Sequence, residues 1–165
     1  MAAVVVDTNV ASVASELSEQ AAPECVLACV DALLRIQDEG GLLLDNLGDV
    51  LLEYTDALGY AGKPGVGRAF VKWVFDHESD ERLIRRIRLT PRTDGGWRRY
   101  EEFPADQSLR RFHGDDQKFA AIAIASGENP DVLNAVDSDW WKHRAALQTH
   151  GVRVQFLCPG QFKGE

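Results

Sequence analysis

Two aspartates stand where short apolar runs of the chain stop abruptly. Asp7 follows Val4-Val5-Val6, and Asp137 follows the run that begins at Val132. A buried parallel strand that ends in aspartate delivers the carboxylate to the edge of the sheet where α/β folds place their sites. Carboxylates that converge at such an edge repel one another unless a divalent cation neutralises them. The pattern therefore indicates a Mg²⁺ or Mn²⁺ site.

Two further acidic positions join this set, each with an alternative. Asp115 and Asp116 stand together before an apolar stretch with helical spacing, so either could be the N-cap of that helix instead of a ligand. Glu53 lies on a second helical stretch beside Asp49, off its apolar stripe, where a solvated acidic face is the ordinary interpretation. Helical spacing alone does not choose between Glu53 and Asp49. The set as a whole favours a site.

Strand-like and helix-like segments alternate along the chain. Apolar runs predict strands at 3–6, 42–44, 83–89, 132–136 and 152–157, and 3.6-residue periodicity predicts helices at 23–38, 47–58, 66–77, 116–126 and 139–149. Asp45 is a plausible N-cap for the helix that follows it. The alternation predicts a three-layer α/β/α fold with a central, mostly parallel sheet covered on both faces.

Length and composition are those of a globular protein. At 165 residues, one domain spanning 1–165 is expected, and no apolar stretch approaches the roughly 18 residues of a membrane span. The start of the chain lacks the features of a signal peptide. The three cysteines show no paired spacing, so we expect Cys25 and Cys29 to be small core residues, no disulfide, and a cytoplasmic location.

Charge is distributed unevenly. The net charge of −8 argues against loose, charge-driven binding to nucleic acid, yet the segment 82–118 holds ten Lys and Arg against six Asp and Glu. Two interpretations of its arginines stand at even weight: a solvated face with ion pairs to neighbouring acids, or a strip that contacts phosphates.

Four motifs together resemble PIN-domain nucleases. They are Val-Val-Asp-Thr-Asn-Val at 5–10, Glu53-Tyr54, Asp-Asp-Gln-Lys-Phe-Ala-Ala-Ile-Ala at 115–123 and Asn-Ala-Val-Asp-Ser-Asp-Trp at 134–140. Their order and spacing match over nearly the whole chain, and only 60–112 lacks a distinctive motif. The resemblance implies a compact α/β/α domain that cleaves RNA, or DNA of particular structure, with Mg²⁺ or Mn²⁺.

The resemblance also assigns residues. It identifies Asp7, Glu53, Asp116 and Asp137 as the catalytic acids. The resemblance thus favours Glu53 over Asp49 and makes Asp116 a ligand instead of a helix cap. Asp139 matches an auxiliary acid of the metal site. Asn9 matches the polar residue that helps orient the first aspartate. Together the acids would hold one or two divalent ions, with water attacking the phosphodiester.

Basic and aromatic residues are candidates for holding the substrate. Arg110, Arg111 and Lys118 could contact the RNA backbone, although Lys118 is equally a surface residue of a first helical turn. Trp140-Trp141 could stack a base, but adjacent helical residues point about 100° apart, so at least one is expected in the core. His113 is expected to be a loop histidine without a catalytic role.

Two alternative functions are also considered. The PIN family often has Thr or Ser where this chain has Ala135, which favours a non-catalytic PIN-like module that binds RNA or a protein partner. A phosphatase or receiver-like domain using Asp7 as nucleophile ranks last, because the dehalogenase-type pattern needs an acid where Asn9 stands. The leading expectation is a metal-dependent endoribonuclease of the toxin–antitoxin type. Its expected partners are a regulatory protein and further copies of the same chain, and no membrane association is expected.

Overall fold

Five parallel strands form the centre of the molecule. The computed structural model describes residues 2–18 and 21–162, and its sheet has the order β3-β2-β1-β4-β5. The strands are Val4–Val6 (β1), Leu42–Asp45 (β2), Ile84–Ile87 (β3), Asp131–Asn134 (β4) and Arg153–Phe156 (β5). Every neighbouring pair is parallel. The predicted parallel sheet is confirmed.

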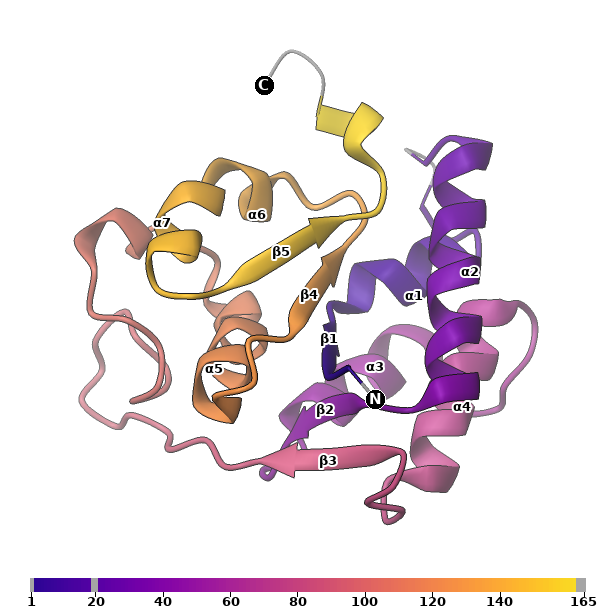
Figure 1. The fold of residues 1–165 in the computed structure, drawn as a ribbon, viewed down its shortest axis with the longest axis horizontal. Coiled ribbons are helices and arrows are strands. Elements are labelled where there is room, and N and C mark those ends of the chain that lie inside the picture. Colours follow the sequence, from indigo (N-terminus) through magenta and orange to yellow (C-terminus); the bar gives the residue numbers. More distant parts are fainter. Residues whose placement is uncertain (1, 19–20, 163–165) are drawn as a thin grey trace.

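Helices cover both faces of this sheet (Figure 1). On one side, four helices pack against one another: Thr8–Ala14 (α1), Pro23–Glu39 (α2), Asp49–Leu58 (α3) and Val66–His77 (α4). On the other lie Gln117–Ser126 (α5), Ser138–Lys142 (α6) and Arg144–Thr149 (α7). Short 3-10 turns occur at Gln107–Leu109 (η1), Gly114–Asp116 (η2) and Pro159–Phe162 (η3). The three-layer α/β/α prediction is therefore confirmed.

The core explains why the central strands read as continuous apolar runs. Val5, Val6, Leu42, Leu43 and Val132 are at most 1 % exposed, because helices cover both faces of β1, β2 and β4. Helix α5 lies over β1, β2, β3 and β4, which accounts for the apolar residues around most of its circumference. No helix among the described residues is long and apolar enough to cross a membrane.

The topology creates one switch point. The chain leaves β1 toward β2 through helices on one face, and it enters β4 and β5 through helices on the other. The crevice beyond the carboxyl ends of two such strands is where open α/β sheets bind ligands. Here β1 and β4 are the two strands at this point, so the residues that follow Val6 and Asn134 emerge beside each other at this edge of the sheet.

Two local predictions need correction. Gly48, not Asp45, is the N-cap residue of α3; Asp45 ends β2 and reaches over the turn to accept bonds from the backbone N–H groups of Asp49 and Val50. The predicted helix 139–149 is two helices, α6 and α7, which meet at His143.

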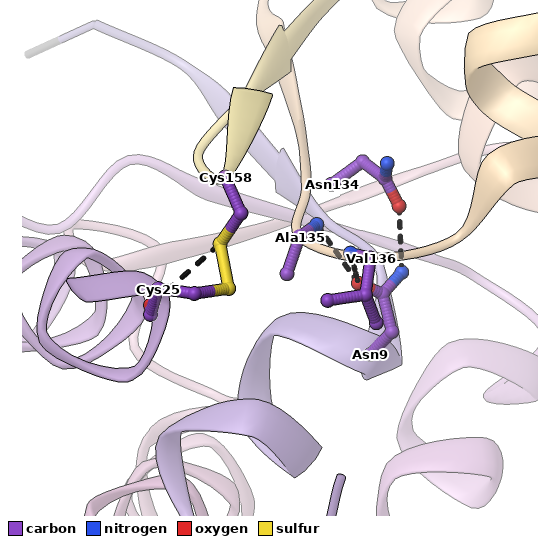
Figure 2. The surroundings of a disulfide bond; sticks show 6 residues. All are labelled: Asn9, Cys25, Asn134, Ala135, Val136 and Cys158. Atoms are coloured by element: carbon purple, nitrogen blue, oxygen red, sulfur yellow. Dashed lines mark hydrogen bonds between the residues drawn. A yellow bond between two sulfur atoms is a disulfide. The ribbon is translucent and has the colours of Figure 1, made fainter. Parts of the chain in front are cut away.

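The prediction that the chain has no disulfide is wrong. Cys25, in the first turn of α2, is bonded to Cys158, which follows β5, with their Cα atoms 5.1 Å apart (Figure 2). The two lie 133 positions apart, so spacing along the chain gave no sign of the pairing. Because the expected reducing cytoplasm drew on the absence of a disulfide, this bond removes that support. Cys29 is a buried free thiol, as expected, and burial raises its pKa to about 12.

Candidate metal centre

Asp7 and Asp137 occupy corresponding places at the switch point. Val6 pairs with Leu133 across the sheet, and each aspartate then begins a helix, Asp7 as N-cap of α1 and Asp137 as N-cap of α6. One oxygen of each carboxylate accepts a bond from a backbone N–H two residues on, at 3.0 Å from Asn9 and 2.9 Å from Asp139. Capping fixes both side chains while leaving carboxylate oxygens for other partners.

Asp116 reaches the same place from a third element. It ends η2, immediately before α5, but its carboxylate makes no capping bond to that helix. Instead, oxygens of Asp7, Asp116 and Asp137 all lie within 4.8 Å of one another. The interpretation of this residue as a helix cap therefore does not account for where its side chain points. Asp115, its neighbour, lies apart and is paired with Arg99.

The crowding of these acids changes how they ionise. Burial raises the pKa of Asp7 to about 6, with the Asn9 and Trp140 bonds acting in the opposite direction. Asp116 has a pKa of about 9, raised first by burial and then by the negative charges of Asp7 and Asp137. A side-chain hydrogen bond between Asp116 and Asp137 raises the pKa of Asp116 further. Without a cation, the group therefore holds a proton on Asp116 at neutral pH.

Trp140 holds the other oxygen of Asp7. Its indole Nε1–H donates to Asp7 Oδ2 at 2.7 Å, and the ring is fully buried with an edge-to-face contact to Phe112. Trp141 instead packs against Phe156 and Phe162. The prediction that at least one of the two tryptophans lies in the core is confirmed. The hydrogen bond from Trp140 to Asp7 was not predicted, because no local sequence pattern reveals it.

Trp140→Phe is expected to destabilise the fold by about 2–4 kcal/mol, and by more above pH 6 than below. The indole bond favours the charged form of Asp7, so its loss raises the folded-state pKa of Asp7 further above 3.8. A carboxyl group with a raised pKa makes stability fall as pH rises from its ordinary value of 3.8 up to its folded-state pKa, so the fall continues to a higher pH in the variant. Urea unfolding in EDTA at pH 5 and pH 8 measures this difference. Trp141→Phe is the control, and an equal pH dependence in both variants would contradict the role of Trp140.

Glu53 lies beside the three aspartates but is engaged by other partners. One carboxylate oxygen accepts a hydrogen bond from the Thr8 hydroxyl, and the other pairs with Lys118 Nζ at 2.7 Å. Asp49, the alternative on the same helix, accepts a bond from the Tyr100 hydroxyl and is not part of the group. The structure thus separates the two acids that helical spacing could not.

Lys118 is buried beneath the site. The residue is 7 % exposed, and its ammonium group also donates to the backbone oxygen of Asp115, in the turn that carries Asp116. The interpretation of Lys118 as a surface residue is therefore wrong. A cation at this depth is kept in place by its carboxylate partner, because an unpaired buried charge is costly.

Asn9 joins the two strand ends that carry the acids. Figure 2 shows its side chain facing the segment after β4, where Oδ1 accepts bonds from the N–H groups of Ala135 (2.8 Å) and Val136 (3.1 Å). Its Nδ2 donates to Asn134 Oδ1 at 2.8 Å, and Asn134 in turn donates to the backbone oxygen of Asp137. These bonds hold the turn before Asp137 against α1. Substrate binding by Asn9 stays a prediction.

Asp139 and His113 connect α6 to the turn before Asp116. Asp139 Oδ2 accepts a bond from the His113 backbone N–H at 2.7 Å, and its other oxygen lies 3.2 Å from His143 Nδ1. Asp139 is outside the group of three close carboxylates. The exposed His113 ring accepts a hydrogen bond from the Asp115 N–H. Among residues 2–18 and 21–162, it makes no hydrogen bond to Asp7, Asp116 or Asp137.

Most arginines of the basic segment are already paired. Carboxylates hold Arg82, Arg85, Arg86, Arg92 and Arg99. For these five, the ion-pair interpretation accounts for the pattern. Arg110 and Arg111 are exposed and, within the part of the chain that the structure describes, have no carboxylate partner. They stand six and five positions before Asp116, so they remain the candidates for a phosphate contact.

With this geometry in view, we compared the chain with known proteins. Comparison with protein-family models, with curated proteins and with solved structures found no match. The function therefore has to be argued from the site itself.

The donor set fits a hard divalent cation. Three carboxylates from three elements offer oxygens at close range, and their mutual repulsion is what a cation would relieve. Mg²⁺ and Mn²⁺ prefer such oxygen ligands, whereas Zn²⁺ is more often bound by nitrogen and sulfur. Asp7, Asp116 and Asp137 are the residues that would hold it. Glu53, already paired with Lys118, borders the group.

Proposed function

We propose that this chain is a PIN-like endoribonuclease that hydrolyses phosphodiester bonds with a Mg²⁺ or Mn²⁺ ion held by Asp7, Asp116 and Asp137. The observation that supports it most is the placement of Asp116, whose carboxyl group lies against two others without capping a helix. Burial first, and then the charges of Asp7 and Asp137, raise the pKa of Asp116 to about 9, and a carboxyl pKa raised in this way opposes folding at neutral pH. A bound cation would offset this cost, because its positive charge stabilises the ionised form of the three carboxylates.

The cation would contribute charge, and the chain would contribute position. A divalent ion bound here polarises a phosphoryl group and lowers the pKa of water. Trp140 and the Asn9 N–H fix both oxygens of Asp7. Asp116 would hold such an ion as a carboxylate and would release its proton to solvent on binding it. Lys118 neutralises Glu53, so the group presents three carboxylates to a ligand instead of four.

Substrate recognition is proposed from the unpaired cations near the site. Arg110 and Arg111 precede the turn that carries Asp116 and are free to contact phosphates, which position a nucleic acid without reading its sequence. RNA is favoured over DNA by the family resemblance alone. A regulatory partner with a basic surface would complement the net charge of −8, and the cytoplasmic location stays part of this proposal.

The test is cleavage of a panel of single-stranded and structured RNAs by purified protein in Mn²⁺, Mg²⁺ or EDTA. We expect metal-dependent cutting that Asp116→Asn reduces at least about 1000-fold, equivalent to about 4 kcal/mol of transition-state stabilisation. Asp115→Asn is the matched control, because Asp115 is exposed and paired with Arg99. Cutting that persists in EDTA, or that Asp116→Asn leaves intact, would exclude this site as the nuclease centre.

A second function is a PIN-like module that binds RNA or a protein without cutting. Ala135 favours it: a buried methyl group stands where the family often has a hydroxyl, next to the turn that carries Asp137. Mn²⁺ titration discriminates between the two. A folded chain that binds Mn²⁺ but cuts nothing lacks its substrate or partner, whereas one that neither binds nor cuts is the module.

A further inference from the structure

Three cysteines converge on the side of the fold where α2 meets the end of β5. Cys25 and Cys29 lie one turn apart on the inner face of α2, and Cys158 comes from the segment after β5. Their three sulfur atoms all lie within 4.8 Å of one another, and each residue is at most 5 % exposed. These are all the cysteines of the chain.

The disulfide accounts for only two of the three. Joining α2 to the end of β5 requires Cys25 and Cys158, and nothing in that bond requires a third sulfur beside it. Cys29 instead lies at the helical spacing i, i+4 from Cys25, which brings two ligands to one cation, and Cys158 supplies a ligand from a separate element. Thiolates are the ligands that select Zn²⁺ and Cu⁺ over Mg²⁺ or Mn²⁺.

A cavity reaches this cluster from outside. It measures about 350 Å³, and Cys25 and Cys158 line it together with Glu24 and Gln161. A metal site needs an entry path, and a three-cysteine site for a tetrahedral cation needs room for a fourth ligand. The cavity offers both, since two of the three cysteines line it.

We propose that, once the Cys25–Cys158 bond is reduced, the three thiols form a binding site for Zn²⁺. The oxidised chain, with its disulfide, and the metal-loaded chain are then alternative ways of joining α2 to the end of β5. This proposal does not rest on the proposed nuclease function, because the site uses sulfur ligands and none of the three aspartates.

The exchange between the two forms balances as follows. A dithiol reductant supplies two electrons and two protons, which break the Sγ–Sγ bond and leave two thiols, while the reductant becomes a disulfide. Zn²⁺ then displaces the thiol protons of its ligands to solvent, because coordinated thiols are deprotonated. No other reactant is needed, and an oxidant of the disulfide class reverses the process as the ion leaves.

The place of this site connects it to the acidic centre. Leu157, just before Cys158, donates its N–H to the backbone oxygen of Asn134 at 2.9 Å, and Asn134 holds the turn before Asp137. Figure 2 shows the disulfide and this turn side by side. Either link, disulfide or cation, keeps the end of β5 anchored to α2 near that turn.

The experiment compares the full chain in oxidised and reduced forms under anaerobic conditions, with the reductant removed before titration. Co²⁺ is the spectroscopic probe, since a thiolate–Co²⁺ charge-transfer band reports sulfur ligands alone, and Zn²⁺ is measured against a chromophoric chelator. The acidic centre is present in both forms, so the difference between them belongs to the thiols. We expect the band, at one ion per chain, only after reduction.

Cys29→Ala tests the third ligand without touching the disulfide. The variant should weaken Zn²⁺ binding by the reduced chain at least about 100-fold, because even losing a hydrogen-bond partner of a ligand costs 10- to 100-fold. An absent band in the reduced wild type, or an equal band in Cys29→Ala, overturns the proposal. Should reduction abolish the near-ultraviolet circular dichroism, recovery on adding Zn²⁺ supports the site and failure to recover overturns it.

Discussion

Asp116→Asn is expected to make the metal-free protein more stable at pH 8, raising its melting temperature by about 5–10 °C. In the folded chain the pKa of Asp116 is about 9, against an ordinary value of 3.8, chiefly because of burial and then because of Asp7 and Asp137. Asparagine resembles the protonated carboxyl and can still donate to Asp137. Relief of about 2–4 kcal/mol corresponds to that temperature shift for a chain of this size.

The sign of the pH dependence follows from proton binding. Between pH 3.8 and about 9, the folded chain keeps a proton on Asp116 that the unfolded chain has lost. Stability therefore falls as pH rises through this range, and Asp7, with its pKa of about 6, adds to the fall in its lower part. The two proteins should be similar near pH 4 and should diverge with increasing pH. Thermal unfolding in EDTA from pH 4 to pH 9 measures this.

Mn²⁺ should reverse the ranking. A ligand at about 1,000 times its dissociation constant stabilises the folded chain by about 4.1 kcal/mol, which exceeds the gain expected from Asp116→Asn, and only the wild type keeps all three ligands. Asp115→Asn is the control and should show no gain in EDTA, because Arg99 already lowers the pKa of Asp115. A wild-type stability that stays flat from pH 5 to pH 9 would contradict the crowding of the three acids. Stabilisation of the metal-free fold together with loss of cleavage is a combination that a damaged fold does not produce.

The parallel sheet and the two strand-end acids were predictable because they depend on local pattern. A short apolar run that ends in aspartate specifies both a buried strand and the edge at which its carboxylate emerges. Asp7 and Asp137 meet because β1 and β4 are neighbours in the sheet, and the alternation of strands and helices does not by itself specify the strand order. The helix 66–77 has the predicted bounds for the same reason, since its apolar stripe has the helical period.

Contacts between distant segments escaped prediction. The Trp140 bond to Asp7, the Lys118 pair with Glu53 and the disulfide join residues 133, 65 and 133 positions apart. None has a signature in spacing, because each partner has an ordinary local explanation. The choice of Glu53 over Asp49 needed either the resemblance or the fold. For the basic segment, of which the sequence left two interpretations open, the ion pairs of Arg82, Arg85, Arg86, Arg92 and Arg99 favour the ion-pair interpretation.

Lys118→Met is expected to destabilise the chain by about 2–4 kcal/mol. The side chains of Lys118 and Glu53 are 9 % and 29 % exposed, and removing one member of a buried pair leaves the other charge without compensation. Glu53 would then repel Asp7 and Asp116, with which it already interacts unfavourably. Urea unfolding in EDTA gives the free energy directly.

The double variant Lys118→Met/Glu53→Gln decides what the pair does. Glutamine keeps an oxygen for the Thr8 hydroxyl but carries no charge, so most of the lost stability should return. Lys142→Met, an exposed lysine on α6, should change stability by less than about 0.5 kcal/mol. If the double variant were no more stable than Lys118→Met, the ammonium would act through packing instead of through Glu53. If stability recovers, the charge of Glu53 is balanced by Lys118 in the wild type. Lys118→Met, whose Glu53 carboxylate has lost this partner, should then bind Mn²⁺ more tightly than the wild type does.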